Sequence, residues 1–126
     1  MIVAGFGFRA GATSASLHDA FGRVHGGGRA TLLATLAAKA ESPAFAEFAR
    51  AAGLPVHPVA PQDAAAQVTL TDGAASQAAH GTGSVAEASA LAAAGPGARL
   101  IGRRVISTDR MATCALARSA SNGGTQ

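Results

Sequence analysis

Two glycine-rich segments of this 126-residue chain stand directly before predicted helices, where proteins often bind anions. The first is GFGFRAGATS, residues 5–14, and the second is HGTGSVAEASAL, residues 80–91. Backbone N–H groups at a helix start favour negative charge, and glycines leave those groups open to a ligand. With Arg9 beside it, the first segment can hold a carboxylate or a phosphate. The alternative, given equal weight, is that its glycines only allow a helix to pack closely on a strand and that Arg9 is solvated.

The residues that we assign to ligand binding are glycines, hydroxyl side chains and charged side chains in or near these segments. They are Gly5, Gly7, Arg9, Gly11, Thr13, Ser14, Lys39, Gly81, Thr82, Gly83, Ser84 and Glu87. Lys39, the only lysine of the chain, directly follows a predicted strand, and ligands of α/β sheets gather at that edge. Ser84 and Glu87 also match the S-x-x-E capping box, which by itself explains both residues.

His80 is the predicted catalytic residue, because the near-neutral pKa of imidazole suits a general base. In an enzyme, the backbone amides of residues 81–84 would stabilise an oxyanion next to it. No second histidine stands at a metal-ligand spacing, and Cys114 lies in an apolar run. We therefore predict neither a metal site nor a thiol nucleophile. The glycines at 5, 7 and 11 do not fit GxGxxG, so no dinucleotide site and no cofactor are predicted.

These residues must be positioned by strands that alternate with helices. Hydrophobic periodicity predicts strands at residues 2–8, 30–37, 54–60, 99–107 and 111–118, and helices at 14–24, 43–52 and 84–94. Two prolines place the third strand at a sheet edge, and a short link joins the last two strands as a hairpin. Val85, Ala88, Leu91 and Ala92 form the predicted apolar face of the last helix. Residues 61–79 show no clear period.

This order predicts the α/β fold class. We expect a three-layer α/β/α sandwich in which a mostly parallel sheet of about five strands carries a C-terminal antiparallel hairpin. The length predicts one domain over residues 1–118, and the polar residues 119–126 are typical of a disordered tail.

Composition narrows the classes of partner. The chain has a net charge of +3, and only 4% of its residues are aromatic. Basic residues that are scattered, with few aromatics between them, argue against nucleic acid. No segment approaches the roughly 18 apolar residues of a membrane span. With a single cysteine and no signal peptide, the sequence favours the cytoplasm.

Several segments together resemble a known family. GFGFRAGATS before an amphipathic helix, LATLAAKAE before a helix and GLPV, and GTGSVAEASALAAAG before a terminal ATCALA are similar to CobE and the C-terminal domain of CbiG, proteins of cobalamin biosynthesis. The resemblance covers Ile2 to Ala117. It implies an α/β sandwich and, as ligands, precorrins, which are macrocycles fringed with carboxylates. CbiG proteins are associated with opening the lactone of a cobalt-precorrin, whereas CobE belongs to the oxygen-dependent pathway.

Three hypotheses follow. The leading one is an accessory or carrier protein that binds a precorrin or corrin intermediate and passes it between cobalamin-pathway enzymes. The alternative is a precorrin hydrolase with His80 as its base. A phosphate or nucleotide module ranks last, because only the glycine turns support it.

Overall fold

Among residues 1–24, 29–65 and 82–119, which the computed structural model describes, five strands form one sheet in the order β3-β2-β1-β5-β4. Only the backbone is described for residues 82–84 and 102–103. The strands are β1 (Ile2–Phe8), β2 (Leu32–Leu36), β3 (Val56–Val59), β4 (Arg99–Ile106) and β5 (Ala112–Arg118). β1, β2 and β3 are parallel, β5 is antiparallel to β1, and β4 is antiparallel to β5. The predicted α/β sheet, parallel in its first three strands, and the terminal antiparallel hairpin are confirmed.

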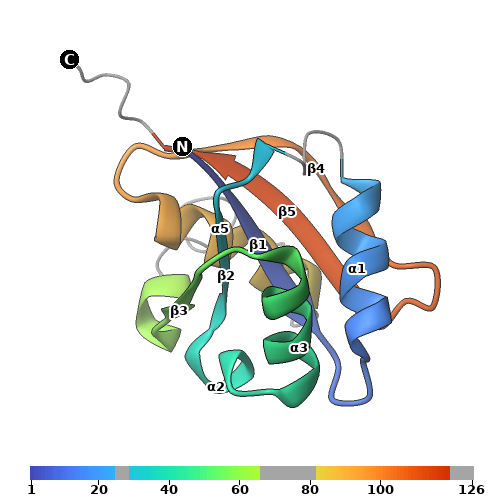
Figure 1. The fold of residues 1–126 in the computed structure, drawn as a ribbon. Coiled ribbons are helices and arrows are strands. Elements are labelled where there is room, and N and C mark those ends of the chain that lie inside the picture. Colours follow the sequence, from blue (N-terminus) through green and yellow to red (C-terminus); the bar gives the residue numbers. More distant parts are fainter. Residues whose placement is uncertain (25–28, 66–81, 120–126) are drawn as a thin grey trace.

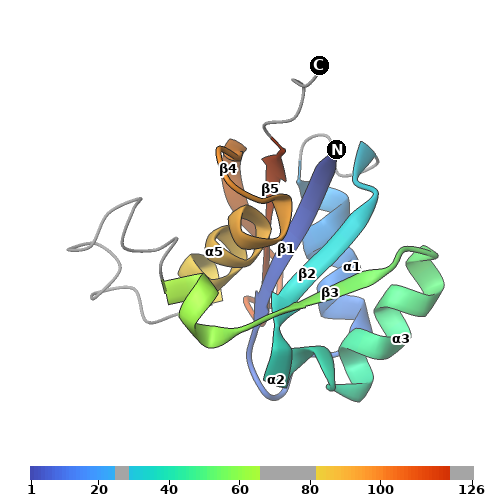
Figure 2. The ribbon, with the colours of Figure 1, turned by 90° about the vertical axis from the view of Figure 1, so that its left-hand side faces the viewer.

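Helices cover both faces of this sheet. They are α1 (Ser14–Arg23), α2 (Ala37–Ala40), α3 (Pro43–Ala52) and α5 (Thr82–Ala94), and residues 61–65 are also helical. α1 and α3 lie on one face and α5 lies on the other (Figures 1 and 2). The predicted three layers are therefore present. Residues 66–79, which the sequence left without a period, lie outside the described residues.

The central strand β1 presents different side chains to the two faces, because successive side chains of a strand alternate. Phe6 and Phe8 point to the side of α1 and α3, where they meet Phe45 and Phe48. Phe6 and Phe48 have ring centroids 5.1 Å apart in an edge-to-face arrangement, which aromatic pairs favour. The few aromatics of the chain are thus concentrated in one half of the core.

The other face of β1 approaches α5 very closely at Gly5. A Cβ atom at Gly5 would lie 2.2 Å from the carbonyl oxygen of Ala86 and 2.5 Å from the backbone nitrogen of Ala90. Ala86 and Ala90 are fully buried, whereas Val85 and Ala92 are only partly buried. Ala88 and Leu91 of the predicted apolar face are buried as expected, but the face is corrected to include Ala86 and Ala90, because the close backbone approach to Gly5 requires small side chains.

The two ends of α3 have the capping features that the sequence predicted. Pro43 occupies the first turn of α3, where its missing N–H costs no hydrogen bond. Gly53 ends α3 in the left-handed conformation, with φ of 72°, and its N–H donates to the carbonyl oxygen of Ala49. β3, which contains Pro58, is an edge strand.

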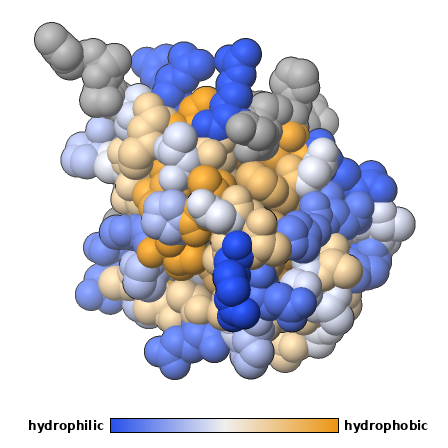
Figure 3. Space-filling model, viewed as in Figure 1, coloured by the Kyte–Doolittle hydropathy of each residue, from blue (hydrophilic) through white to orange (hydrophobic). Residues whose placement is uncertain are grey.

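The face of the molecule drawn in Figure 3 mixes polar and apolar residues, as the hydropathy colours show. Among the described residues, the exposed large hydrophobic side chains are Met1 and Ile106. None of the helices in the described ranges combines the length and the apolar character needed to cross a bilayer. The Ser119 N–H donates to the carbonyl oxygen of Met1, and the rest of the predicted tail, 120–126, lies outside the described residues.

Gly5→Ala tests the close packing of α5 on β1. We expect it to lower the free energy of unfolding by about 3 kcal/mol, since the new methyl group would overlap backbone atoms that cannot rotate away. Urea denaturation measures the change. Gly22→Ala in α1 is the matched control, because a Cβ atom there meets nothing within 4 Å. This variant should gain about 0.5–1 kcal/mol, since alanine is the better helix former. Equal stability of the two variants would contradict the packing argument.

Candidate functional site

The carboxyl ends of the three parallel strands meet at one edge of the sheet, the position at which ligands of α/β proteins bind. Arg9 follows β1, and Lys39 lies in α2, directly after β2. The turn between β4 and β5 reaches the same edge, because the Arg9 N–H donates to the carbonyl oxygen of Met111 over 2.9 Å. We call this region, formed by residues 9–13, 37–41 and 107–111, the ligand edge.

Lys39 is held by an aromatic ring at the ligand edge. Its Nζ atom lies 5.1 Å from the centroid of the Phe8 ring, within the range of a cation–π contact. Phe8 is buried, and its ring is stacked with that of Phe45 at a centroid distance of 5.6 Å and an interplanar angle of 6°. The structure therefore brings Lys39 to the end of β1, where Phe8 is the last residue of the strand.

The glycines of the first segment have different environments. Gly5 and Gly7 are buried inside β1, and Gly5 is covered by α5. Gly11 is exposed, and a Cβ atom there would be 3.0 Å from the end of the flexible Met111 side chain. Gly11 is thus at the ligand edge, whereas Gly5 serves packing, which was the alternative interpretation of these glycines.

Thr13 and Ser14 begin α1. Thr13 is the N-cap, and it exchanges hydrogen bonds with Ser16: the Ser16 N–H donates to Thr13 Oγ1, and the Thr13 N–H donates to Ser16 Oγ, both over 3.2 Å. These bonds satisfy backbone donors at the helix start that a ligand would otherwise meet. Ser14 is half-buried in the first turn.

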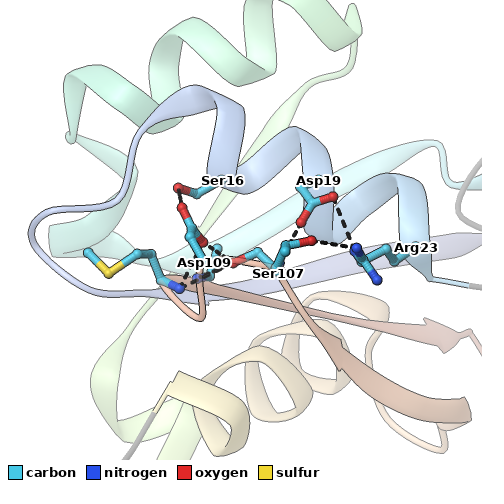
Figure 4. A network of polar contacts seen from close by, with 8 residues as sticks. Ser16, Asp19, Arg23, Ser107 and Asp109 are labelled. Atoms are coloured by element: carbon cyan, nitrogen blue, oxygen red, sulfur yellow. Dashed lines mark hydrogen bonds and ion pairs between the residues drawn. The ribbon is translucent and has the colours of Figure 1, made fainter.

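A carboxylate of the chain itself lies against the first turn of α1. The Ser16 hydroxyl donates to Asp109 Oδ2 over 2.6 Å, so the turn between β4 and β5 is fastened under the helix (Figure 4). Negative charge is favourable at this end of a helix. The α1 start that sequence reasoning assigned to a ligand anion therefore already has an anion of the protein beside it.

Ser107 and Asp109 order the turn. The Ser107 hydroxyl donates to Asp109 Oδ1 over 2.5 Å and accepts from the Met111 and Ala112 N–H groups. Hydrogen bonds from Ser107 first, and then from Ser16 and the Met111 N–H, lower the pKa of Asp109 below its usual value of 3.8.

A second attachment joins the same turn to α1 one helical turn further on. Asp19 Oδ2 accepts from the Thr108 N–H over 2.5 Å, and Asp19 Oδ1 accepts from Arg23 Nε over 3.1 Å. Arg23 also donates to the Thr108 hydroxyl. These contacts, the Thr108 N–H foremost, lower the pKa of Asp19. α1 and the hairpin turn are therefore connected at two points by acidic side chains.

Arg110 is a candidate that sequence reasoning missed. It has φ of 62°, the left-handed conformation that non-glycine residues rarely adopt, and its side chain is exposed. Such strain is common at functional sites. Arg110 precedes Met111, the residue that Arg9 contacts, so a third cation joins Arg9 and Lys39 at the ligand edge. None of the three takes part in an ion pair among the residues that the structure describes.

The second glycine-rich segment is only partly described. His80 and Gly81 lie outside the described residues, as do the side chains of Thr82 and Ser84 and the surroundings of Gly83. α5 begins at Thr82, so Ser84 is helical and cannot be the N-cap that the S-x-x-E pattern predicted. Glu87 instead forms an ion pair with Arg104 on β4, with 3.8 Å between Glu87 Oε2 and Arg104 Nη1. The capping box is thus corrected, because α5 starts two residues earlier and Glu87 faces a cation on the sheet.

Two other kinds of reactive group are metal ligands and the thiol of Cys114. No three His, Cys, Asp or Glu side chains in the described ranges are placed to hold a metal ion. Cys114 is buried in β5, and desolvation raises the pKa of its thiol, which keeps it protonated.

Comparison with known proteins assigns the chain to a family. The family described as Cobalamin synthesis G C-terminus matches residues 2–117, nearly the whole chain. The chain belongs to this family. The resemblance noted in the sequence is thereby confirmed, and the ligand edge lies wholly within the matched residues.

Two solved structures support the assignment at the level of sequence. The cobalamin biosynthesis protein chiG from Agrobacterium tumefaciens C58 is 36% identical, with 96% of this chain and 100% of that chain covered and a TM-score of 0.71. CobE, a protein from the cobalamin (vitamin B12) biosynthetic pathway, is 30% identical, with 94% of this chain and 89% of that chain covered and a TM-score of 0.74.

A cobalamin biosynthesis protein G homolog from Sulfolobus solfataricus shares the fold, with a TM-score of 0.63, 19% identity, and 92% of this chain and 36% of that chain covered. The comparison with curated proteins gave no match.

The two-point attachment of α1 predicts a dependence of stability on pH. Because the folded-state pKa of Asp109 is lowered, its ionised form stabilises the fold at pH values above about 4, and this contribution is lost as the pH falls through the folded pKa. Asp109→Asn should lower the free energy of unfolding at pH 7, and its difference from the parent should shrink towards pH 2. Urea denaturation across this range measures both.

Glu47→Gln is the control for that experiment, since Glu47 is an exposed carboxylate of α3 without a hydrogen bond or ion pair among the described residues. It should follow the parent at every pH. A deficit of Asp109→Asn that is the same at pH 7 and pH 2 would show that ionisation of Asp109 does not stabilise the turn.

Proposed function

We propose that this chain binds a precorrin or corrin intermediate of cobalamin biosynthesis as an accessory or carrier protein. The observation that carries the proposal is the set of three cations at the ligand edge, Arg9, Lys39 and Arg110, which have no carboxylate partner among the described residues. Membership of a cobalamin-synthesis family supports this choice of ligand class.

The chemistry of the ligand suits this edge. Precorrins carry carboxylates around the rim of a macrocycle, so one molecule presents several anions at fixed spacings. Guanidinium and ammonium groups bind carboxylates through charge-assisted hydrogen bonds, and arginine does so with two parallel bonds. Three cations that come from β1, α2 and the hairpin turn can contact separate carboxylates, because each is carried by a different element.

Cations without an internal ion pair are also ready for a ligand, since no such pair has to be broken first. Arg104, in contrast, lies near Glu87, and Arg23 pairs with Asp19. Arg23 and Arg104 thus have a carboxylate partner inside the protein, whereas Arg9, Lys39 and Arg110 at the ligand edge have none among the described residues.

Titration of the purified protein with hydrogenobyrinic acid and with earlier precorrins, followed by absorbance and calorimetry, tests the proposal. We expect saturable binding that weakens as salt is added, because the attraction is electrostatic. Lys39→Ala, Arg9→Ala and Arg110→Ala should each lower the affinity about tenfold, as expected for the loss of one charge-assisted hydrogen bond.

Arg50→Ala is the matched control, because Arg50 is an exposed arginine in the last turn of α3, at the opposite edge of the sheet. It should bind like the parent. Absence of binding by the parent at high micromolar ligand would overturn the proposal. Conversion of excess ligand by substoichiometric protein, seen as a mass change, would replace the carrier by the hydrolase with His80 as its base.

A further inference from the structure

We infer that Phe8 is a positioning residue for Lys39, and that the ring holds the ammonium group in place to receive a ligand carboxylate. The inference rests on the proposed function for the identity of that ligand. Its starting point is the 5.1 Å distance between Lys39 Nζ and the centroid of the Phe8 ring.

The ring has a fixed orientation. Phe8 is 4% exposed and is the last residue of β1, so its backbone is held by the sheet. Its ring stacks with that of Phe45, which is completely buried and contacts Phe6 and Phe48 in turn. A ring packed in this way cannot turn aside, so the direction of its electron-rich face is set by the core.

The backbone of Lys39 is fixed as well. The Lys39 carbonyl oxygen accepts from the Ser42 N–H over 3.0 Å, in the bend that leads from α2 into α3. α2 is only four residues long and follows β2 without a loop, so the sheet determines where it begins. The Lys39 side chain therefore extends from a fixed point towards a fixed ring.

Holding a lysine matters because its side chain is long and flexible. A free lysine loses much rotational freedom when it binds a carboxylate, and that loss weakens the complex. Contact with a ring restricts the side chain before the ligand arrives. Lys39 as a whole is also only half-buried, so its side chain keeps access to solvent and to an anion. An aromatic ring at this position thus makes a mobile cation into a pre-arranged one.

The single lysine of the chain makes the geometry directly measurable. Protein grown with lysine carrying 13C at Cε gives one side-chain NMR signal, that of Lys39. Protons above an aromatic face are shifted upfield by the ring current, so we expect the Lys39 signal upfield of free lysine. Phe8→Leu should move it back to the free position. Phe48→Leu is the control, because Phe48 is a buried aromatic of the same cluster without a lysine contact among the described residues.

A double-mutant cycle tests whether Phe8 acts through Lys39 on the ligand. Phe8→Leu should weaken binding of hydrogenobyrinic acid about two- to fivefold, as expected for the loss of one exposed cation–π contact. In the Lys39→Ala background the same substitution should change the affinity no further, since the group that Phe8 holds is gone. A purely structural effect of Phe8 would persist in that background.

The outcomes separate this inference from the proposed function. A Lys39 signal at the position of free lysine in the parent, or unchanged by Phe8→Leu, overturns the positioning role whatever the ligand does. Equal effects of Phe8→Leu with and without Lys39 overturn it too. If the parent binds no precorrin or corrin, the proposed function falls, and the NMR comparison still decides whether Phe8 holds Lys39.

Discussion

The close approach of α5 to β1 over Gly5 is the constraint on which the rest of the structure depends. β1 is the middle strand of the sheet, and it pairs with β2 on one side and β5 on the other. A side chain at Gly5 would have to overlap backbone atoms of α5, so the helix could not lie where it does. Because α5 covers Gly5, the face of β1 that carries Phe6 and Phe8 is the one left for the aromatic core. That core in turn fixes the ring beside Lys39.

Much of the fold could be predicted from sequence because its signals are local. The apolar run Ile2–Phe8, the proline that opens α3, the glycine that ends it, and the prolines at 55 and 58 each reflect only a few neighbouring residues. The sheet edge that carries Arg9 and Lys39 followed from the alternation of strands and helices, which predicts a mostly parallel sheet. These predictions needed no knowledge of which side chains touch across the sheet.

The remaining features depend on contacts between distant residues, and the sequence shows no pattern for them. Ser16 and Asp109 are 93 positions apart, and no sequence pattern near either residue predicts the hydrogen bond between them. The capping box predicted at Ser84 was wrong, because α5 begins at Thr82 and Ser84 is therefore inside the helix. Glu87 lies near Arg104 of β4. Arg110 escaped notice because its left-handed backbone becomes visible only in the folded turn.

The pairing of β1 with β5 has a consequence for how the chain folds during synthesis. The first strand leaves the ribosome with one edge that only residues 112–118 can complete. The nascent chain therefore carries an open, apolar strand edge at the centre of its future sheet until residues 112–118 have been made, and such edges favour pairing with other chains. α1 likewise lacks its attachment until the turn between β4 and β5, which carries Thr108 and Asp109, has been made. The sheet can thus be completed only after β5 has been made and has paired with β1.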